Sequence, residues 1–276
     1  HRLRAMTPIE IALHARKSHA AVIQYRRAHP GGPLIVVLTG TDLYRDIASS
    51  AEARHSLEMA SRLVVLQERG ARELAVCHRA KTRVIYQSAD VDLRHAPRAQ
   101  AFRIAVVGHL REEKDPFRAV HALARLPREG NVEVIQLGAA LTRDMEQQAT
   151  VWMNREPRYH WLGSKPHKQA LRWMAGSHLL VVSSAMEGGA NVICEAARIG
   201  VPVLASRVSG NIGMLGADYP GYFRLFDDAQ LAKLIERTVG DKVFYRALQC
   251  AVLKRRPLFA PAGECRALKR LLQEFR

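Results

Sequence analysis

Apolar runs of strand length alternate with segments of helical periodicity along most of the chain. The runs 34–38 and 179–182 are continuously apolar and contain β-branched residues, which predicts strands buried in parallel sheets. The segments 141–153 and 166–175 instead have apolar positions at the helical period. This alternation predicts an α/β protein whose helices cover parallel, doubly wound sheets.

The stretch 179–199 combines a strand, a glycine turn and a helix. The apolar run leads to Gly188-Gly189, and a helix is expected from about Ala190 onward. The first N–H groups of a helix lack partners inside the helix, and its dipole favours negative charge there. Because glycines let a ligand approach the backbone closely, this turn is a candidate site for a diphosphate.

Two carboxylates flank the glycine turn. Glu187 precedes it, and Glu195 follows on the helix, four residues after Asn191 and therefore on the same helix face. A carboxylate accepts hydrogen bonds from the vicinal hydroxyls of a sugar, so the arrangement suggests a nucleotide-sugar site. The alternative is an ordinary strand–helix corner with a solvated Glu187 and Glu195 on the helix surface.

A second candidate site follows the strand 34–38. The chain there reads Thr39-Gly40-Thr41-Asp42-Leu-Tyr-Arg45-Asp46. Ligands of open α/β sheets bind beyond the carboxyl ends of the strands, so this polar, glycine-containing end is suited to contact one.

Composition adds an excess of positive charge. The formal net charge is +16, which suits anionic substrates, an anionic membrane surface or nucleic acid. No nucleic-acid-binding motif accompanies the charge, and no apolar run reaches the length of a membrane span. The 4 scattered cysteines argue against a zinc site or a disulfide framework and favour a reducing cytoplasm.

The glycine turn carries a family resemblance. Glu187 to Glu195 resembles the Glu-x7-Glu element of glycosyltransferase family 4, Trp161-Leu162-Gly163 is similar to a strand end of that family, and 200–206 is similar to a later strand. The resemblance implies the GT-B fold: two Rossmann-like, doubly wound parallel-sheet domains that face a cleft, with a C-terminal helix crossing back.

The resemblance also implies a domain organisation. The expected parts are an N-terminal, acceptor-side domain (1–97), a C-terminal, nucleotide-sugar-binding domain (98–252) and a helix that packs back on the N-terminal domain (253–276). The first domain of this family begins with a further strand and glycine-rich turn. Nothing before Ile9 matches them, so we expect that an N-terminal segment is missing from the sequence.

A second motif resembles the family's diphosphate-binding "G-R-x-x-x-x-K". It lies at 108–114, where Lys114 matches the lysine, His109 stands in place of the arginine, and Arg111 is placed to supply the missing charge. Without the resemblance, Arg111 and Lys114 would be interpreted as a solvated helix start. The glycine-rich segment 209–213 is expected to form a loop that closes over the sugar nucleotide.

The family roles are carried over residue by residue. Glu187 is implied to bind the transferred sugar, and Glu195 the ribose of the nucleotide. The residues implied to bind the sugar nucleotide are Gly108, His109, Leu162, Glu187, Gly188, Gly189, Ala190, Asn191 and Glu195. The residues implied to act in catalysis are Lys114, Arg111, Glu187 and His14.

Four segments are similar to one subgroup, the selenosugar synthases of selenoneine biosynthesis: 38–46, 108–116, 187–191 and 216–223. This resemblance implies a UDP-sugar, chiefly UDP-N-acetylglucosamine, as glycosyl donor and selenophosphate as acceptor. The implied products are a 1-selenosugar, UDP and phosphate. No cofactor or metal is implied, because cations and a helix terminus already serve the diphosphate.

An anionic acceptor changes what the acceptor site must provide. An alcohol must lose a proton, whereas selenophosphate is already anionic and requires no general base. It requires positive charge and hydrogen-bond donors beside the reacting carbon. The candidates for this role are His14, Arg16, Lys17, Thr39, Thr41, Asp42 and Arg45.

Two alternatives remain open at this point. One is a GT-B transferase that acts on an ordinary alcohol, such as a glycan or a lipid, with the positive charge serving membrane attachment. The other is a non-catalytic nucleic-acid-binding protein, which would bind oligonucleotides in a salt-sensitive way. The selenosugar synthase interpretation needs neither nucleic acid nor a membrane.

Overall fold

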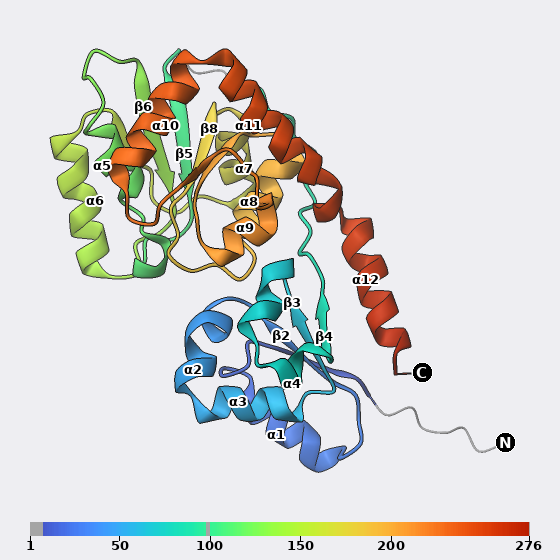
Figure 1. Ribbon diagram of the computed structural model, residues 1–276. Coiled ribbons are helices and arrows are strands. Elements are labelled where there is room, and N and C mark those ends of the chain that lie inside the picture. Colours follow the sequence, from blue (N-terminus) through green and yellow to red (C-terminus); the bar gives the residue numbers. More distant parts are fainter. Residues whose placement is uncertain (1–7, 98–99, 276) are drawn as a thin grey trace. The chain divides into compact units, whose positions relative to one another are not determined.

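The structure is a computed structural model that describes residues 8–97 and 100–275 (Figure 1). The residues before Pro8, residues 98 and 99 at the predicted start of the second domain, and Arg276 lie outside the described ones. The chain forms two compact units. The described residues of the first unit are 8–87, 186–189 and 262–275, and those of the second are the rest up to Pro261.

The first unit contains a parallel sheet of order β1-β2-β3-β4. Its elements, in chain order, are β1 (Glu10–Leu13), α1 (His19–Ala28), β2 (Leu34–Leu38), a π-helical turn (Asp42–Asp46), α2 (Ile47–Ser49), α3 (Ala51–Met59), β3 (Arg62–Val65), a 3-10 helix (Glu68–Glu73), α4 (Val76–Arg79), β4 (Thr82–Val84) and the C-terminal helix α12 (Pro261–Gln273). The polar segment after β2 is thus largely helical.

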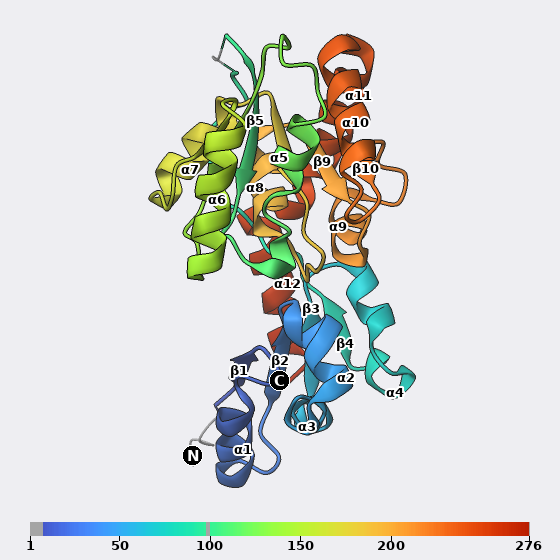
Figure 2. The same cartoon turned by 90° about the vertical axis from the view of Figure 1, so that its left-hand side faces the viewer.

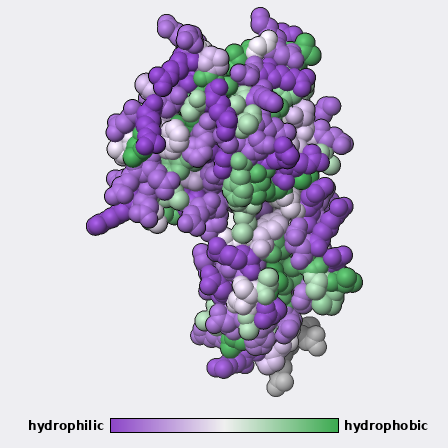
Figure 3. All heavy atoms as spheres, turned by 60° about the vertical axis from the view of Figure 1, so that its left-hand side comes forward, coloured by the Kyte–Doolittle hydropathy of each residue, from purple (hydrophilic) through white to green (hydrophobic). Residues whose placement is uncertain are grey.

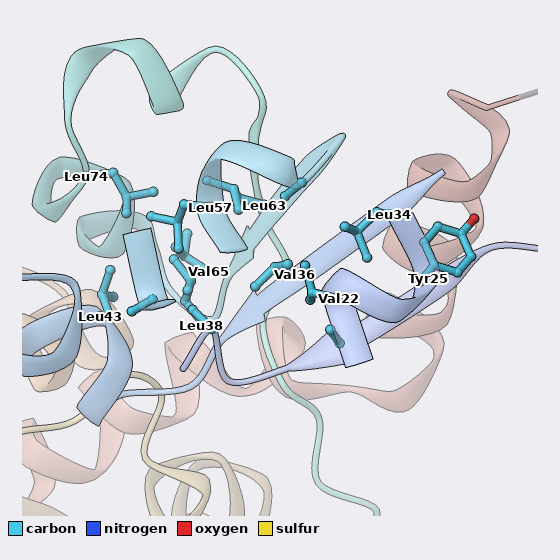
Figure 4. Packing of buried hydrophobic residues seen from close by; sticks show 14 residues of the cluster. Val22, Tyr25, Leu34, Val36, Leu38, Leu43, Leu57, Leu63, Val65 and Leu74 are labelled. Carbon is cyan, nitrogen blue, oxygen red and sulfur yellow. The ribbon is translucent and has the colours of Figure 1, made fainter. Parts of the chain in front are cut away.

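Alternation along the strands gives this sheet two apolar faces. Val36, Leu38, Leu63 and Val65 point into one core, shared with residues of α1 and α3 (Figure 4). Ile35 and Val64 occupy the other face of β2 and β3 and pack against α12 through Leu271. The C-terminal helix therefore covers one face of this first sheet.

The second unit contains a six-stranded parallel sheet of order β10-β9-β8-β5-β6-β7. Its strands are β5 (Phe102–Val107), β6 (Val132–Leu137), β7 (Tyr159–Trp161), β8 (Leu179–Val182), β9 (Val203–Ser206) and β10 (Tyr222–Phe223). Its helices are a 3-10 turn (Glu112–Lys114), α5 (Arg118–Leu123), α6 (Arg143–Arg155), α7 (His167–Ala175), α8 (Asn191–Ile199), α9 (Ser209–Leu215), α10 (Asp228–Gly240), α11 (Lys242–Arg255) and a 3-10 turn (Arg256–Phe259).

Helices cover both faces of this second sheet. Helices α5 and α10 pack together on one side, while α8 packs against α7 and α11 on the other (Figures 1 and 2). The extended residues before β5 also belong to this unit, because the N–H groups of His95 and Ala96 donate to the carbonyls of Ile199 and Ala175 at 3.1 and 2.9 Å.

The predicted glycine-rich loop 209–213 is wrong. These residues form the start of α9, and residues 210–215 are all buried. The side-chain amide of Asn211 donates to the carbonyl and the hydroxyl of Ser206, both at 3.0 Å. This internal bonding and the burial of the neighbouring apolar residues outweigh the low helical propensity of the glycines.

Hydrophilic residues predominate on the face shown in Figure 3. Among the described residues, no helix combines the length and apolar character needed to cross a bilayer. The 4 cysteines form no disulfide with one another, and Cys194 is the buried one.

Candidate functional site

The second sheet has a topological switch point between β5 and β8. These strands are neighbours, yet the chain continues from β5 to β6 and β7 on one side and from β8 to β9 and β10 on the other. The loops that follow β5 and β8 consequently diverge from adjacent strand ends. Crevices of this kind are the usual ligand sites of open α/β sheets.

Hydrogen bonds join these two loops. The N–H of Ala185 donates to the carbonyl of Glu113 at 2.9 Å. The hydroxyl of Ser183 donates to the carbonyl of Asp115 at 2.8 Å and lies 3.1 Å from that of Lys114. The backbone of Lys114 is therefore fixed beside the segment that leads to the glycine turn, as the proposed phosphate role of this lysine requires.

The other residues predicted after β5 have different surroundings. Arg111 is exposed and directly precedes the 3-10 turn. His109 is exposed as well, and its Nδ1 accepts a hydrogen bond from the N–H of Ala139 at 3.1 Å. Gly138 packs so closely on Gly108 that an added Cβ would lie 2.0 Å from the Gly108 carbonyl oxygen. The His109 ring is thus held by the neighbouring loop.

Leu162 lies at the same end of the sheet but on its edge. It follows β7, which is separated from β5 by β6. Its N–H donates to the carbonyl of Gln136 at 2.9 Å, which continues the sheet bonding by one residue.

Helix α8 begins directly after the glycine turn. Its cap residue, Ala190, supplies no side-chain acceptor for the N–H groups of the first turn, and that turn contains no acidic residue. Such a terminus is suited to an anion. Among the described residues, no group of three His, Cys, Asp or Glu side chains is placed to hold a metal ion.

Glu195 is a buried carboxylate on α8. Its Oε1 accepts hydrogen bonds from Nε2 of His167 at 2.7 Å and from Nδ2 of Asn191 at 3.0 Å. Only 5% of the residue is exposed. Burial raises the pKa of the Glu195 carboxyl, and the bond from His167 acts in the opposite direction. Glu195 is thus a buried acid on the helix that starts at the glycine turn, and its contact with a ribose stays a prediction.

The glycine turn itself belongs to the first unit. Glu187 is buried, and a Cβ on Gly188 would lie 2.2 Å from the carbonyl oxygen of Thr39. Only a glycine allows this approach, so the side chain is absent at Gly188 for packing as well as for any ligand.

Asp42 has a structural role in place of the predicted contact with an acceptor. Its carboxylate accepts hydrogen bonds from the N–H groups of Thr39, Gly40 and Ala15 at 2.9, 2.9 and 3.0 Å. The residue is completely buried. It therefore joins the segments that follow β1 and β2, which brings the two predicted groups of acceptor residues together.

His14 and Thr41 face each other across these segments. His14 has a left-handed backbone, with φ at 72°, and is buried. Its Nδ1 accepts from the N–H of Lys17 at 3.3 Å, which places the ring proton on Nε2, 3.0 Å from the Thr41 hydroxyl. The imidazole donates to Thr41, whose own proton is then directed to another acceptor.

The predicted arginines converge on Asp46. Nε of Arg16 lies 2.9 Å from one carboxylate oxygen and Nε of Arg45 3.4 Å from the other. Nε2 of His14 lies 3.7 Å from the same carboxylate. Two of the cations predicted for the acceptor are therefore neutralised in part by Asp46, while the side chain of Lys17 is exposed.

Three contributors were not predicted from the sequence: Ser183, Asp46 and His167. Ser183 follows the end of a buried strand and precedes the glycine turn, so its position was a usable signal. The bonds of Asp46 and His167 span 30 and 28 residues. No local sequence pattern predicts these two long-range bonds.

Solved structures similar to this chain share its fold. A structure of Anabaena Alr3699/HepE in complex with UDP-glucose is 19% identical, with 96% of this chain and 79% of that chain covered and a TM-score of 0.80. Sucrose-phosphate synthase (tll1590) from Thermosynechococcus elongatus is 19% identical, with 97% and 73% covered and a TM-score of 0.81. The lipopolysaccharide outer core galactosyltransferase WaaB is 14% identical, with 99% and 77% covered and a TM-score of 0.73. The predicted GT-B fold class, with two parallel-sheet α/β domains, is confirmed.

No curated protein matches the chain in sequence. The family profile described as glycosyl transferases group 1 matches residues 94–251, more than half of the chain. That span contains the switch point, Lys114, the start of α8 and Glu195. The chain belongs to the glycosyl transferases group 1 family.

Proposed function

We propose that this protein transfers a sugar, chiefly N-acetylglucosamine, from its UDP-sugar to selenophosphate. The selenium attacks the anomeric carbon, the bond from that carbon to the diphosphate oxygen breaks, and UDP leaves with the electron pair. Water then attacks phosphorus and the selenium–phosphorus bond breaks, so the products are a 1-selenosugar, UDP and phosphate. UDP-sugar use is supported by neighbours of the same fold that were solved with UDP and with UDP-glucose.

The main support for binding of the UDP-sugar donor is the switch point of the second sheet. There no side chain caps the first turn of α8, and the backbone of Lys114 is fixed beside the preceding loop by Ser183. These groups suit the diphosphate and the charge that develops on it as the bond to the sugar breaks. Arg111, exposed on the same loop, provides a second cation. Glu195 is assigned to the ribose and Glu187 to the transferred sugar.

The main support for binding of the acceptor, selenophosphate, is the arrangement of His14 and its hydrogen-bond partners. Because Nε2 of His14 donates to Thr41, the hydroxyl proton of Thr41 is available to an anionic oxygen. Lys17 and the arginines bound to Asp46 add positive charge around it. The resemblance to selenosugar synthases supports selenophosphate as that anion.

A second candidate acceptor is an ordinary alcohol. It would use the other tautomer of His14, in which Nδ1 carries the proton, 3.9 Å from a carboxylate oxygen of Asp42, and Nε2 accepts the proton of the alcohol. A histidine beside a carboxylate is a common general base, which an alcohol requires and selenophosphate does not.

Incubation of the protein with UDP-N-acetylglucosamine, with and without selenophosphate, distinguishes these candidates. The proposal predicts that UDP release depends on selenophosphate and yields a selenium-bearing sugar by mass spectrometry. Release that needs only an alcohol would establish the second candidate. A protein that neither binds UDP nor releases it would contradict both.

A further inference from the structure

The two oxygens of the Glu195 carboxylate are used unequally. Oε1 accepts both hydrogen bonds, from His167 at 2.7 Å and from Asn191 at 3.0 Å. Within residues 8–97 and 100–275, no side chain or backbone group donates to Oε2. One oxygen is thus occupied by the protein, and the other is left for a ligand.

The surroundings make a charge on this carboxylate costly. The side chain of Glu195 is 7% exposed, and an ionised group removed from water must be compensated by hydrogen-bond donors. The side chain of His167, by contrast, is 66% exposed. His167 therefore approaches the buried acid from the solvent side, where a ligand of Oε2 would also arrive.

Among the charged side chains of the described residues near Glu195, His167 is the one that forms a hydrogen bond with its carboxylate. Helix α7 contributes His167, whose hydrogen bond and charge both lower the pKa of the Glu195 carboxyl. Arg255 of α11, which also packs against α8, donates instead to the carbonyls of Met214 and Gly213 at 2.8 and 3.1 Å. Among the described residues, Arg198 of α8 makes neither a hydrogen bond nor an ion pair with Glu195. Asn191 is a neutral second donor.

We propose that His167 is a positioning residue of the donor site, which keeps Glu195 anionic and directs Oε2 to a hydroxyl of the donor's ribose. The inference rests on the proposed function, because it assigns the ribose to Glu195. His167 would thereby set the lower pH limit of UDP binding: protonated Glu195 loses the charge that makes its hydrogen bond to the ribose strong.

The sign of the effect follows from the contact. Removal of His167 takes a hydrogen-bond donor from the ionised carboxylate of Glu195. The ionised form becomes less stable relative to the protonated form, so the pKa of Glu195 rises. The acid limb of the binding profile, the range in which UDP affinity falls as pH decreases, then moves to higher pH. Glutamine at this position restores an N–H donor of similar reach, so it should restore most of the original limb.

The test is UDP affinity measured by calorimetry between pH 5 and 8 for the wild type, His167→Ala and His167→Gln. The acid limb of His167→Ala should lie about one pH unit higher, which is about a tenfold loss of affinity on that limb. His167→Gln should lie close to the wild type. His160→Ala is the matched control, because His160 is an exposed histidine of the same unit on β7, and its limb should not move.

A second readout does not depend on UDP. The carboxyl carbon of Glu195, followed by 13C NMR in the ligand-free protein, should titrate at higher pH in His167→Ala than in the wild type and in His167→Gln. Coincident titrations and coincident acid limbs in all variants would overturn the role of His167. If the Glu195 titration moves in His167→Ala but the wild type binds no UDP at any pH, the assignment of Glu195 to the ribose fails together with the proposed function.

Discussion

The hydroxyl of Ser183 donates to the carbonyl of Asp115 at 2.8 Å and thereby ties the end of β8 to the loop after β5. Asp115 has a left-handed backbone, with φ at 44°, at the point where that loop turns toward α5. The bond fixes the backbone of Lys114, the neighbour of Asp115, next to the segment that leads into α8. One buried hydroxyl thus sets the relation between two parts of the proposed diphosphate site.

Replacement of Ser183 by alanine should weaken UDP binding as well as stability. The carbonyls of Lys114 and Asp115 lose their donor, which costs about 1–3 kcal/mol of unfolding free energy. Ser177→Ala is the matched control, because the Ser177 hydroxyl donates to the Trp173 carbonyl at 2.7 Å and lies before β8 instead of after it. Urea unfolding and calorimetry should show destabilisation of both variants and a loss of UDP affinity in Ser183→Ala alone. Equal UDP affinity in the two would contradict this account of the loops.

Replacement of Lys114 by methionine should lower UDP affinity about tenfold, the loss expected for one charged hydrogen bond. Because one cation fewer faces the diphosphate, the affinity should also fall less steeply with added salt. Lys242→Met removes an exposed lysine at the start of α11 and should leave both quantities unchanged. An unaltered salt dependence in Lys114→Met would show that this lysine does not contact the diphosphate.

Replacement of Asp42 by asparagine should destabilise the first unit by about 3 kcal/mol, because an amide nitrogen would face backbone N–H groups that need an acceptor. Hydrogen exchange of the Thr39 and Gly40 amides, which donate to Asp42 at 2.9 Å, should accelerate strongly. Asp92→Asn changes an exposed carboxyl and should not affect them. Continued protection of both amides in Asp42→Asn would refute the structural role assigned to Asp42.

Glu274 should contribute stability that depends on pH. Its carboxylate accepts hydrogen bonds from Nε of Arg83 at 2.8 Å and Nε of Arg62 at 2.6 Å, and these arginines lower its pKa to about 2. The pKa in the folded protein lies below the ordinary value of 4.5, so the stabilisation is complete above that pH and disappears as pH falls toward 2. Glu274→Gln should cost at most about 1 kcal/mol near pH 7, since the pair is accessible to solvent.

Unfolding measured from pH 7 to pH 2 checks this expectation. The difference between the wild type and Glu274→Gln should shrink steadily and vanish near pH 2. Glu236→Gln, at an exposed carboxyl on α10, serves as the control. A difference of constant size over the whole range would exclude the ion pair as its source.

Much of the fold could be predicted from apolar periodicity. The runs that form β2 and β8 were predicted with the bounds that the structure gives them, 34–38 and 179–182, because buried parallel strands are apolar throughout. Helix α9 could not be predicted, because its stability comes from burial and from the bond between Asn211 and Ser206. The helical turn at Asp42 could not be predicted either, because it too involves burial and a side-chain hydrogen bond, that of Asp42 to the backbone.

The candidate site divides in the same way. Asn191 and Glu195 were linked by their spacing of four residues on one helix, and their side chains are bonded at 3.0 Å. His167 reaches Glu195 only because α7 packs against α8, and no local pattern encodes that contact. Asp42 was predicted to contact the acceptor, whereas its carboxylate accepts hydrogen bonds from backbone N–H groups, because the residue is buried.

The most direct test of the central claim, a UDP-sugar site at the switch point of the second sheet, is UDP binding to the wild type and to Glu195→Ala by calorimetry near pH 7.5. The account predicts one UDP per chain for the wild type and a loss of about 1–3 kcal/mol of binding free energy in the variant, because the charged hydrogen bond to the ribose is removed. Undiminished binding in Glu195→Ala, or no binding by the wild type, would contradict it.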